Sequence, residues 1–420
     1  MNRPSLDKLR SLVRRVFKVF AVLATLGVLG VAALLGSLWL EHRTAITLPT
    51  PTGPFAVGRT IYDWSDEAAV DTLAPVAGTK RELLAWIWYP ATPEQSGTVV
   101  DDYVPPAVGA AVERVRTGIF GFLTKDVSKV HAHSLRNANV SLQQQSYPVL
   151  ILRGGASSEA WNYSALAEDL ASHGYVVVGL DAPYRTGVVV FPDGRVVRRT
   201  SENNPELCEE KTGREREACA NRIIAAWTAD MAFALDRSAQ LNTADPAGKF
   251  TGRFDLTRVG IFGHSFGGAQ AAELCSQDSR CKAGVDVDGS LHGNVIQTGI
   301  HTPFMFLLSG QGDFSSSDAE VRQIWADIQS VYNRLPANKR LLITIRGANH
   351  FLFSDDGALL KSHILMRTLR MFGVLHMDGR RQLAVTAYCL RSFLDTYLKR
   401  PGVAPPKIAS PLYSEIQTIE

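Results

Sequence analysis

Residues 259–268 read Val-Gly-Ile-Phe-Gly-His-Ser-Phe-Gly-Gly, with Ser265 between an apolar run and a helix-like stretch. The order of strand, tight turn and helix is typical of a nucleophile elbow, in which the serine sits at the apex of a strained turn. Glycines flank such a serine because a Cβ there would clash with the neighbouring strand or helix. The serine oxygen is then exposed. This stretch therefore predicts a serine hydrolase, whereas G-x-S-x-G without a strand and a helix beside it would indicate only a glycine-rich turn.

Short apolar runs alternate with helical patterns from residue 147 onward. The expected strands are 149–152, 176–180, 259–262, 283–287, 304–308 and 341–345, after an earlier one at 82–89; the expected helices are 161–173, 223–241, 318–335 and 382–398. Continuous apolar strands that alternate with helices predict a mostly parallel sheet with helices on both faces, and with the elbow this indicates an α/β-hydrolase fold. The active site is then expected at the carboxyl ends of the strands.

The hydrolase domain is expected to occupy residues 44–400. Residues 44–58 are rich in Pro, Thr and Gly and indicate an extended linker into this domain. Residues 101–139 show no clear period and are interpreted as an insertion that shapes the substrate cleft. Residues 401–420, which contain Pro405-Pro406, are expected to form a surface tail.

Residues 19–40 contain no charged side chain. As a helix they would be about 33 Å long, enough to cross the apolar core of a bilayer. Six basic residues precede this run: Arg3, Lys8, Arg10, Arg14, Arg15 and Lys18. Their position predicts a cytoplasmic N-terminus and a periplasmic or extracellular catalytic domain. The length of the run and its poor cleavage site favour an uncleaved signal-anchor over residues 1–43; a cleaved signal peptide, giving a secreted protein, and a buried soluble helix are the alternatives.

The cysteines agree with export. Cys208 and Cys219 bracket one charged segment, and Cys275 and Cys281 bracket another, so both pairs are candidate disulfides in an oxidising compartment; the alternative is that all five cysteines are reduced. Cys389 lies in an apolar helical pattern and is expected to be a buried free thiol. Since no Cys-x-x-Cys occurs, no metal site is expected. The net charge of +3 gives no case for nucleic-acid binding.

A serine nucleophile needs a base within hydrogen-bond reach and an acid that orients the base. His350 follows the expected strand 341–345 through a flexible turn, which predicts an imidazole above the carboxyl edge of the sheet; His292 is the next candidate. Two aspartates fit the role of the acid. Asp288 follows strand 283–287, and Asp313 follows strand 304–308 through Ser-Gly-Gln-Gly, a position that the order of the fold slightly favours.

Two backbone N–H groups are expected to hold the oxyanion. One is that of Phe266, directly after the nucleophile. The other should come from the loop after strand 149–152, which reads Arg153-Gly154-Gly155-Ala156. Because consecutive glycines let the backbone approach a substrate closely, Gly155 is the predicted second donor.

Several further blocks occur in order between residues 51 and 350: PTGPFAVG at 51–58, LAWIWYP at 84–90, DLASHG at 169–174, GHSFGG at 263–268, AGVDVD at 283–288 and TIRGANH at 344–350. Together they resemble the platelet-activating-factor acetylhydrolase family, the plasma-type, calcium-independent phospholipase A2 enzymes. In that family the triad aspartate ends the strand that Asp288 ends here, so the resemblance favours Asp288 over Asp313. The second oxyanion donor of the family maps onto Gly155.

The resemblance implies hydrolysis of short or oxidised sn-2 acyl groups of phospholipids, and no metal or organic cofactor is expected. An exported enzyme anchored at a membrane, as the N-terminal segment predicts, would meet lipids readily. Two departures concern specificity. Arg153 stands where the family has histidine, and could meet an anionic group or pair with a carboxylate; the segment with Cys208 and Cys219 is unlike the family and is expected near the cleft. The alternatives are a general carboxylesterase, lipase-like or polyester hydrolase, and a membrane-tethered binding protein on an inactive hydrolase fold.

Overall fold

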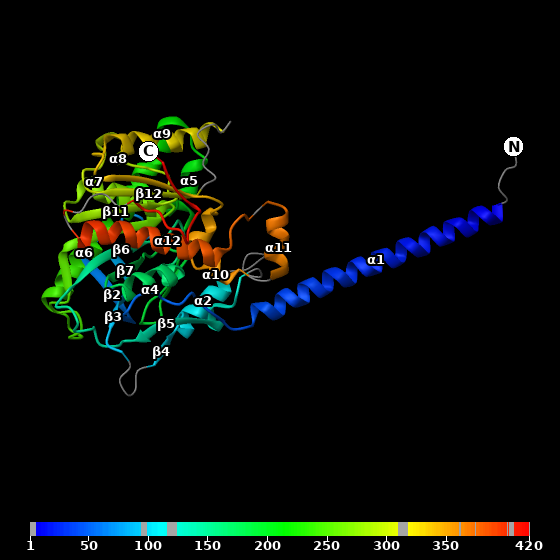
Figure 1. The fold of residues 1–420 in the computed structure, drawn as a ribbon, viewed down its shortest axis with the longest axis horizontal. Coiled ribbons are helices and arrows are strands. Elements are labelled where there is room, and N and C mark those ends of the chain that lie inside the picture. Colours follow the sequence, from blue (N-terminus) through cyan, green and yellow to red (C-terminus); the bar gives the residue numbers. More distant parts are fainter. Residues whose placement is uncertain are drawn as a thin grey trace.

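The computed structural model describes residues 6–93, 99–115, 124–309, 318–360, 363–373, 375–400, 402 and 407–419. One long N-terminal helix projects from a layered domain of helices and strands (Figure 1). The helices are α1 Leu6–His42, α2 Pro106–Val115, α4 Ser164–Ser172, α5 Glu206–Glu209, α6 Gly213–Thr243, α7 Phe266–Gln277, α8 Val295–Thr298, α9 Ala319–Arg334, α10 Asp356–Leu359, α11 His363–Met371 and α12 Gly379–Leu394. The strands are β1 Ile46–Thr47, β2 Ala56–Val70, β3 Lys80–Ala91, β4 Val100–Asp102, β5 Val130–Arg136, β6 Tyr147–Arg153, β7 Val176–Asp181, β8 Val188–Val190, β9 Val196–Arg198, β10 Phe254–His264, β11 Cys281–Val287, β12 Phe304–Ser309, β13 Arg340–Ile345 and β14 Ile416–Ile419.

The main sheet runs in the order β1-β5-β2-β3-β7-β6-β10-β11-β12-β13-β14, with β4 paired to β5. Its centre, from β7 to β13, is parallel, while β2, β3 and β7 pair antiparallel. The chain passes from β6 to β7 on one side and later to β10 on the other side. This reversal of winding direction lies between β6 and β10, and such a switch point is where ligand crevices form in open α/β sheets.

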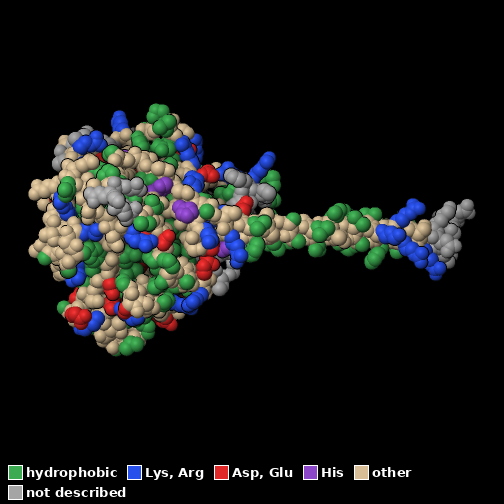
Figure 2. Space-filling view, turned by 90° about the horizontal axis from the view of Figure 1, so that it is seen from below, with side chains coloured by type: hydrophobic (Ala, Val, Ile, Leu, Met, Phe, Trp, Pro, Cys, Tyr) green, Lys and Arg blue, Asp and Glu red, His purple; other side chains and the backbone are tan. Residues whose placement is uncertain are grey.

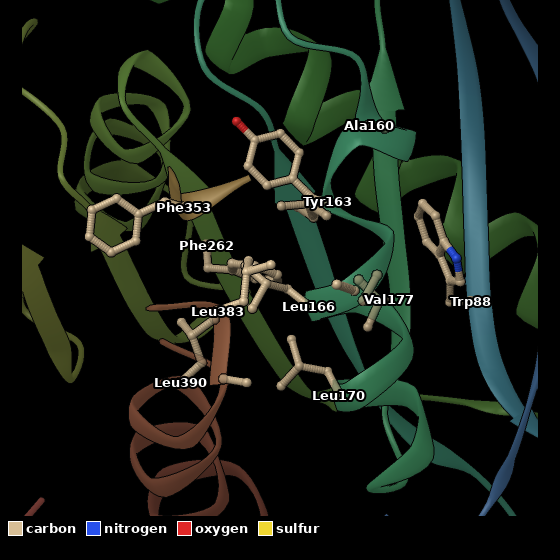
Figure 3. Close-up of a cluster of buried hydrophobic side chains, with 14 of the residues drawn as sticks. Trp88, Ala160, Tyr163, Leu166, Leu170, Val177, Phe262, Phe353, Leu383 and Leu390 are labelled. Carbon is tan, nitrogen blue, oxygen red and sulfur yellow. The ribbon is translucent and has the colours of Figure 1, made fainter. Parts of the chain in front are cut away.

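Two hydrophobic cores cover the two faces of the sheet. Alternate residues of β6 show the division, since Leu150 and Leu152 belong to one core and Val149 and Ile151 to the other. The first core packs α4 and α12 against the strands, as the side chains of Leu166, Leu383 and their neighbours show (Figure 3). The second core is covered by α6, α7 and α9. Because both faces are covered, the central strands carry continuous apolar runs, such as residues 149–152 of β6 and 176–180 of β7, as the sequence indicates.

Three segments differ from the sequence-based expectations. Residues 44–58 are not a free linker, because Ile46–Thr47 pairs with β5, and β2 begins at Ala56. Within residues 101–139, β4 and β5 join the edge of the sheet; residues 116–123 lie outside the described part. The predicted surface tail is wrong for Ile416–Ile419, which pairs antiparallel with β13. All three are edge additions, where proline is tolerated and the sequence signal for a strand is weakest.

Helix α1 is long and apolar enough, by length and composition, to cross a membrane, and a signal sequence would pass the same test. Its apolar side chains are exposed along the shaft, with Lys and Arg side chains gathered towards its N-terminal end (Figure 2). Its last turn is attached to the domain: His42 Nδ1 lies 2.6 Å from the Thr124 carbonyl, and Lys125 Nζ donates to the Glu41 carbonyl at 2.7 Å.

A buried carboxyl group ties the loop after β13 to the first core. Asp355 Oδ1 accepts the Ala165 N–H at 3.0 Å, and its Oδ2 accepts the Tyr103 hydroxyl at 2.9 Å. Burial, opposed only in part by these two bonds, raises the pKa of Asp355 from 3.8 to about 8. The neutral carboxyl therefore stabilises the fold below pH 3.8, and this contribution is lost as the pH rises through about 8.

We expect Asp355→Asn to gain stability relative to the wild type as the pH rises from 4 to 8. The amide keeps the bond to Ala165 and can donate to the Tyr103 hydroxyl, but it does not titrate. The difference should grow by up to about 1.4 kcal/mol per pH unit, and thermal unfolding measured at each pH follows it. The matched control is Asp356→Asn, at the half-buried neighbouring position, which should show a smaller trend. A difference for Asp355→Asn that stays constant over this range would contradict the assignment.

Candidate active site

Ser265 occupies the turn between β10 and α7 with φ 56° and ψ −125°, a strained conformation for a non-glycine residue. Its N–H donates to the Val287 carbonyl at 2.8 Å, which ties the turn to the end of β11. The flanking glycines are required by space. A Cβ on Gly263 would lie 2.2 Å from the Gly267 carbonyl oxygen, and one on Gly267 would lie 2.2 Å from that of Arg153. The local structure is therefore a nucleophile elbow.

Ser265, His350 and Asp288 form one hydrogen-bonded chain. His350 Nε2 lies 3.1 Å from Ser265 Oγ, and His350 Nδ1 lies 2.8 Å from Asp288 Oδ2. The three residues follow the carboxyl ends of three parallel strands: Ser265 follows β10, Asp288 follows β11 and His350 lies beyond β13. Asp288 is held from its other side, since its Oδ1 accepts the Ser309 N–H at 2.6 Å.

The charge of Asp288 decides the tautomer of His350. Burial would raise the pKa of Asp288, but the hydrogen bond and charge of His350, together with the Ser309 N–H, lower it below its ordinary value. The carboxylate can only accept, so His350 Nδ1 carries a proton and donates it to Asp288. Nε2 is then the ring nitrogen that faces Ser265, and whenever it carries no proton its lone pair can accept a hydrogen bond from the Ser265 hydroxyl.

The alternative acid and the alternative base, Asp313 and His292, are not part of the described hydrogen-bonded chain. Asp313 lies outside the described residues. His292 is half-buried, with its ring 5.8 Å from that of Phe266, and desolvation together with the nearby Arg216 lowers its pKa. It lines the same cleft as Ser265. No described hydrogen bond joins it to the serine.

The two predicted oxyanion donors are close to Ser265. Phe266 is the first residue of α7 and follows Ser265 directly. Gly155 lies so near that a Cβ on it would be 3.2 Å from the Ser265 Cβ. Its N–H, however, donates to the Tyr163 hydroxyl at 3.0 Å. In this structure the Gly155 N–H therefore already has a partner, which the sequence did not indicate.

Tyr163 and His264 are site residues that the sequence analysis missed. The Tyr163 hydroxyl lies 2.8 Å from His264 Nδ1, and the His264 ring packs on that of His350 with centroids 4.7 Å apart. Burial, reinforced by the charge of His350, lowers the pKa of His264 to about 3, so this ring stays neutral. The middle position of G-x-S-x-G could have drawn attention to His264, whereas no local pattern singles out Tyr163.

Arg153 does not face the cleft. Its guanidinium is fully buried, donates to the Leu180 carbonyl, and lies 4.8 Å above the Trp227 ring. Arg153 is therefore placed to hold the fold rather than to meet an anionic substrate group. Its described partners include a backbone carbonyl and an aromatic ring, and no described ion pair joins it to the carboxylate that the sequence analysis considered.

A cleft of about 490 Å³ opens above Ser265. Its walls include Gly155, Pro205, Phe266, Ser290 and Phe351. Within the described part of the chain, no group of three or more His, Cys, Asp or Glu side chains could hold a metal ion.

The cysteines pair as the spacing suggests. Disulfides join Cys208 to Cys219 and Cys275 to Cys281. Cys389 is free and buried, and burial raises the pKa of its thiol to about 12, so it is unreactive at neutral pH.

Comparison with known proteins gives consistent results. The sequence profile of the family described as platelet-activating factor acetylhydrolase, isoform II, matches residues 41–192 and 227–400. A probable 1-alkyl-2-acetylglycerophosphocholine esterase of Arthroderma benhamiae is 25% identical over 338 residues, which cover 76% of this chain and 78% of that protein. The platelet-activating factor acetylhydrolase of Bos taurus is 26% identical over 227 residues, 50% of this chain and 49% of that protein.

A solved structure, the ferulic acid esterase from Streptomyces cinnamoneus, superposes with a TM-score of 0.70 at 23% identity and covers 90% of this chain and 100% of its own. This likeness confirms the predicted α/β-hydrolase fold. The relatives, together with this fold, make the protein a serine ester hydrolase. Since the family profile matches most of its length, the chain belongs to the platelet-activating factor acetylhydrolase isoform II family.

Proposed function

We propose that this protein hydrolyses short or oxidised sn-2 acyl esters of phospholipids through an acyl-enzyme formed on Ser265. The observation that carries the mechanism is the hydrogen-bonded chain from Ser265 through His350 to Asp288 at the floor of the cleft. The substrate class rests on the family and on the names of the relatives, one of which is a probable 1-alkyl-2-acetylglycerophosphocholine esterase.

In the first half-reaction, Ser265 Oγ attacks the ester carbonyl carbon while His350 Nε2 takes the hydroxyl proton. Asp288 keeps its charge and stabilises the imidazolium that forms. The tetrahedral intermediate collapses, the bond to the alcohol oxygen breaks, and the alcohol leaves with the proton from Nε2. In the second half-reaction, water gives a proton to His350 Nε2 and attacks the acyl carbon. The second tetrahedral intermediate collapses, the bond from the acyl carbon to Ser265 Oγ breaks, and Nε2 returns the proton to Oγ as the acid leaves.

The oxyanion of each intermediate is assigned to the N–H groups of Phe266 and Gly155. For Gly155 this requires an exchange, because its N–H must leave the Tyr163 hydroxyl when substrate oxygen arrives. Tyr163 can keep its contact with His264 during this exchange. Such donors contribute roughly 3–4 kcal/mol each to the transition state.

A general carboxylesterase is the second candidate, and one observation favours it. Among the described residues that line the catalytic cleft, none is Lys or Arg, and Glu206 is the charged one. A phosphate group in this cleft would therefore gain no ion pair from these walls. Phospholipid preference would then depend on access to a membrane surface rather than on recognition of the head group.

The proposed location is a membrane, with the basic N-terminus in the cytoplasm and the catalytic domain exported. It is supported by the apolar shaft of α1, by the basic residues ahead of it, and by the two disulfides, which persist in oxidising compartments.

We expect Ser265→Ala to abolish covalent labelling by a fluorophosphonate probe and to lower ester hydrolysis at least about 1,000-fold. The measurement uses p-nitrophenyl esters of graded acyl length beside a 2-acetyl phospholipid. Cleavage of both substrate types by the wild type supports the phospholipase proposal. Turnover of simple esters alone supports the general esterase. A wild type that is neither labelled nor active would indicate a binding protein on an inactive fold.

We expect Asp288→Asn to lower kcat by roughly 1,000-fold or more, because His350 then loses the acceptor that fixes its tautomer. The matched control is Asp286→Asn, on the same strand end. Its buried Oδ1 accepts the Gly289 N–H at 2.8 Å, and it has no described contact with His350, so kcat should fall far less than in Asp288→Asn. Asp313→Asn tests the other acid; a large loss there with Asp288→Asn active would reverse the assignment.

The full chain is expected to stay in the membrane fraction after extraction with alkaline carbonate. A variant that lacks residues 1–43 should appear in the soluble fraction, since α1 supplies the apolar surface. N-terminal sequencing of the mature protein provides the control. A mature terminus near residues 37–43 would show that the segment is a cleaved signal and would overturn the anchor.

A further inference from the structure

One segment near the cleft falls between the two stretches that match the family profile. These stretches end at residue 192 and resume at residue 227. We call residues 203–221 the bridged segment, because the disulfide between Cys208 and Cys219 closes it into a loop. It contains α5 and the first turns of α6.

The bridged segment forms a wall shared by two cavities. Pro205 and Glu206 line the cleft that contains Ser265. Pro205 also lines a second cavity of about 350 Å³, together with Cys208, Arg216 and Ala220. Pro205, Ser290 and His292 border both cavities, so the second cavity, which we call the side cavity, adjoins the catalytic cleft.

The opposite wall of the side cavity comes from α8 and α9. Ile296 and Ile324 supply apolar surface there, and Gln297 supplies hydrogen-bonding groups. Arg216 pairs with Glu320 at 2.6 Å across the two walls, and Glu217 also lines the cavity, so acidic side chains outnumber the guanidinium among its described lining residues. The volume lies at the lower end of the range for small-molecule sites. The cavity therefore suits a short, uncharged arm of a substrate rather than a phosphate group.

The bridged segment is packed directly against the residues beside the nucleophile. Cys208, Cys219 and Trp227 share a small hydrophobic cluster with Phe266, and Ala156 packs against this cluster. The rings of Trp227 and Phe266 meet edge to face with centroids 5.0 Å apart. The disulfide thus belongs to the same packing unit as the predicted oxyanion residue Phe266.

Polar contacts fix the start of the segment to the domain. Asn203 donates to the Leu73 carbonyl and accepts the Trp227 indole N–H at 3.2 Å through its own carbonyl. Ser157, in the loop after β6, donates to Asn204 Oδ1 at 3.3 Å. The wall is therefore attached both to the oxyanion loop and to the helix that carries Trp227.

We propose that the bridged segment determines which esters this enzyme accepts, and that the side cavity receives the arm of the ester that extends beyond the scissile bond. The disulfide holds this wall in place against Phe266. The proposal rests on the proposed reaction at Ser265, whose substrate arms must lie in the cleft or in a cavity next to it. A disulfide that served stability alone would leave the relative rates for different esters unchanged, and this difference makes the proposal testable.

The first experiment fills the side cavity. The full-length wild type and Ala220→Trp are compared on p-nitrophenyl esters from acetate to octanoate, and on acetate esters of alcohols from methanol to hexanol. We expect kcat/KM for the shortest ester to stay within about twofold and to fall at least about tenfold for the longer members of one series. The series that shows the loss identifies the arm. Ala218→Trp, at an exposed position on the same helix, is the matched control and should match the wild type.

Ile324→Trp fills the same cavity from α9, so the test does not depend on Ala220 alone.

A second experiment removes the disulfide of the bridged segment with the double variant Cys208→Ser and Cys219→Ser. We expect the ratio of kcat/KM for long and short esters to change at least about fivefold. The control is the double variant Cys275→Ser and Cys281→Ser, which removes the other disulfide, between the end of α7 and the start of β11, and should keep the wild-type ratio.

Two results would overturn the proposal. One is an equal loss for every ester, including the shortest, in both cavity-filling variants, which would show that the wall acts only on the Ser265 site. The other is unchanged selectivity in both of them, which would show that the side cavity is unused. Failure of the proposed function is distinguishable, because in that case Ser265→Ala would retain the wild-type rate on all esters.

Discussion

The hydrogen bond from the Ser265 N–H to the Val287 carbonyl fixes the position of Ser265 relative to Asp288, and the rest of the candidate site depends on this placement. It fixes a serine with positive φ against the end of β11, one residue before Asp288. Asp288 in turn donates its own N–H to the Leu307 carbonyl of β12, so the acid is placed by two neighbouring strands. Ser265 and Asp288, the proposed nucleophile and acid, are therefore positioned directly at the ends of β10 and β11, whereas His350 lies five residues beyond the end of β13.

The sheet can hold this geometry because both of its faces are buried. Strain at one turn, of the order of 1–3 kcal/mol, persists only where the surrounding structure determines it. Here the surrounding structure includes backbone contacts too close for any side chain at Gly263 and Gly267. The buried neutral carboxyl of Asp355 then ties the loop of His350 to α4 through Ala165. The geometry of the proposed catalytic residues therefore depends on the packing of the core in this fold.

The sequence predicts the centre of the molecule better than its edges, and the reason is physical. A parallel strand buried on both faces has a continuous apolar run in its sequence, so β6, β10 and β11 can be predicted. Ser265 and Asp288 directly follow β10 and β11, so their positions can be predicted as well. Edge strands such as Ile46–Thr47 and Ile416–Ile419 are short and half exposed, and their composition resembles that of loops. The hydrogen bond from the Gly155 N–H to the Tyr163 hydroxyl depends on how the Tyr163 side chain is oriented in the folded protein. No hydrophobic pattern in the sequence indicates this contact, so it could not be predicted.

The junction between α1 and the domain has a mechanical consequence. The last turn of α1 is fastened by contacts of His42 and Glu41 to residues 124–126, and the strand Ile46–Thr47 follows it within a few residues. Because its last turn is hydrogen-bonded to the domain, α1 is joined to the domain without a free linker. Embedded in a bilayer, it would hold the mouth of the cleft at a set height and tilt above the lipid surface. The molecules that reach Ser265 would then be selected by how far they rise from that surface, before any side chain in the cleft contacts them.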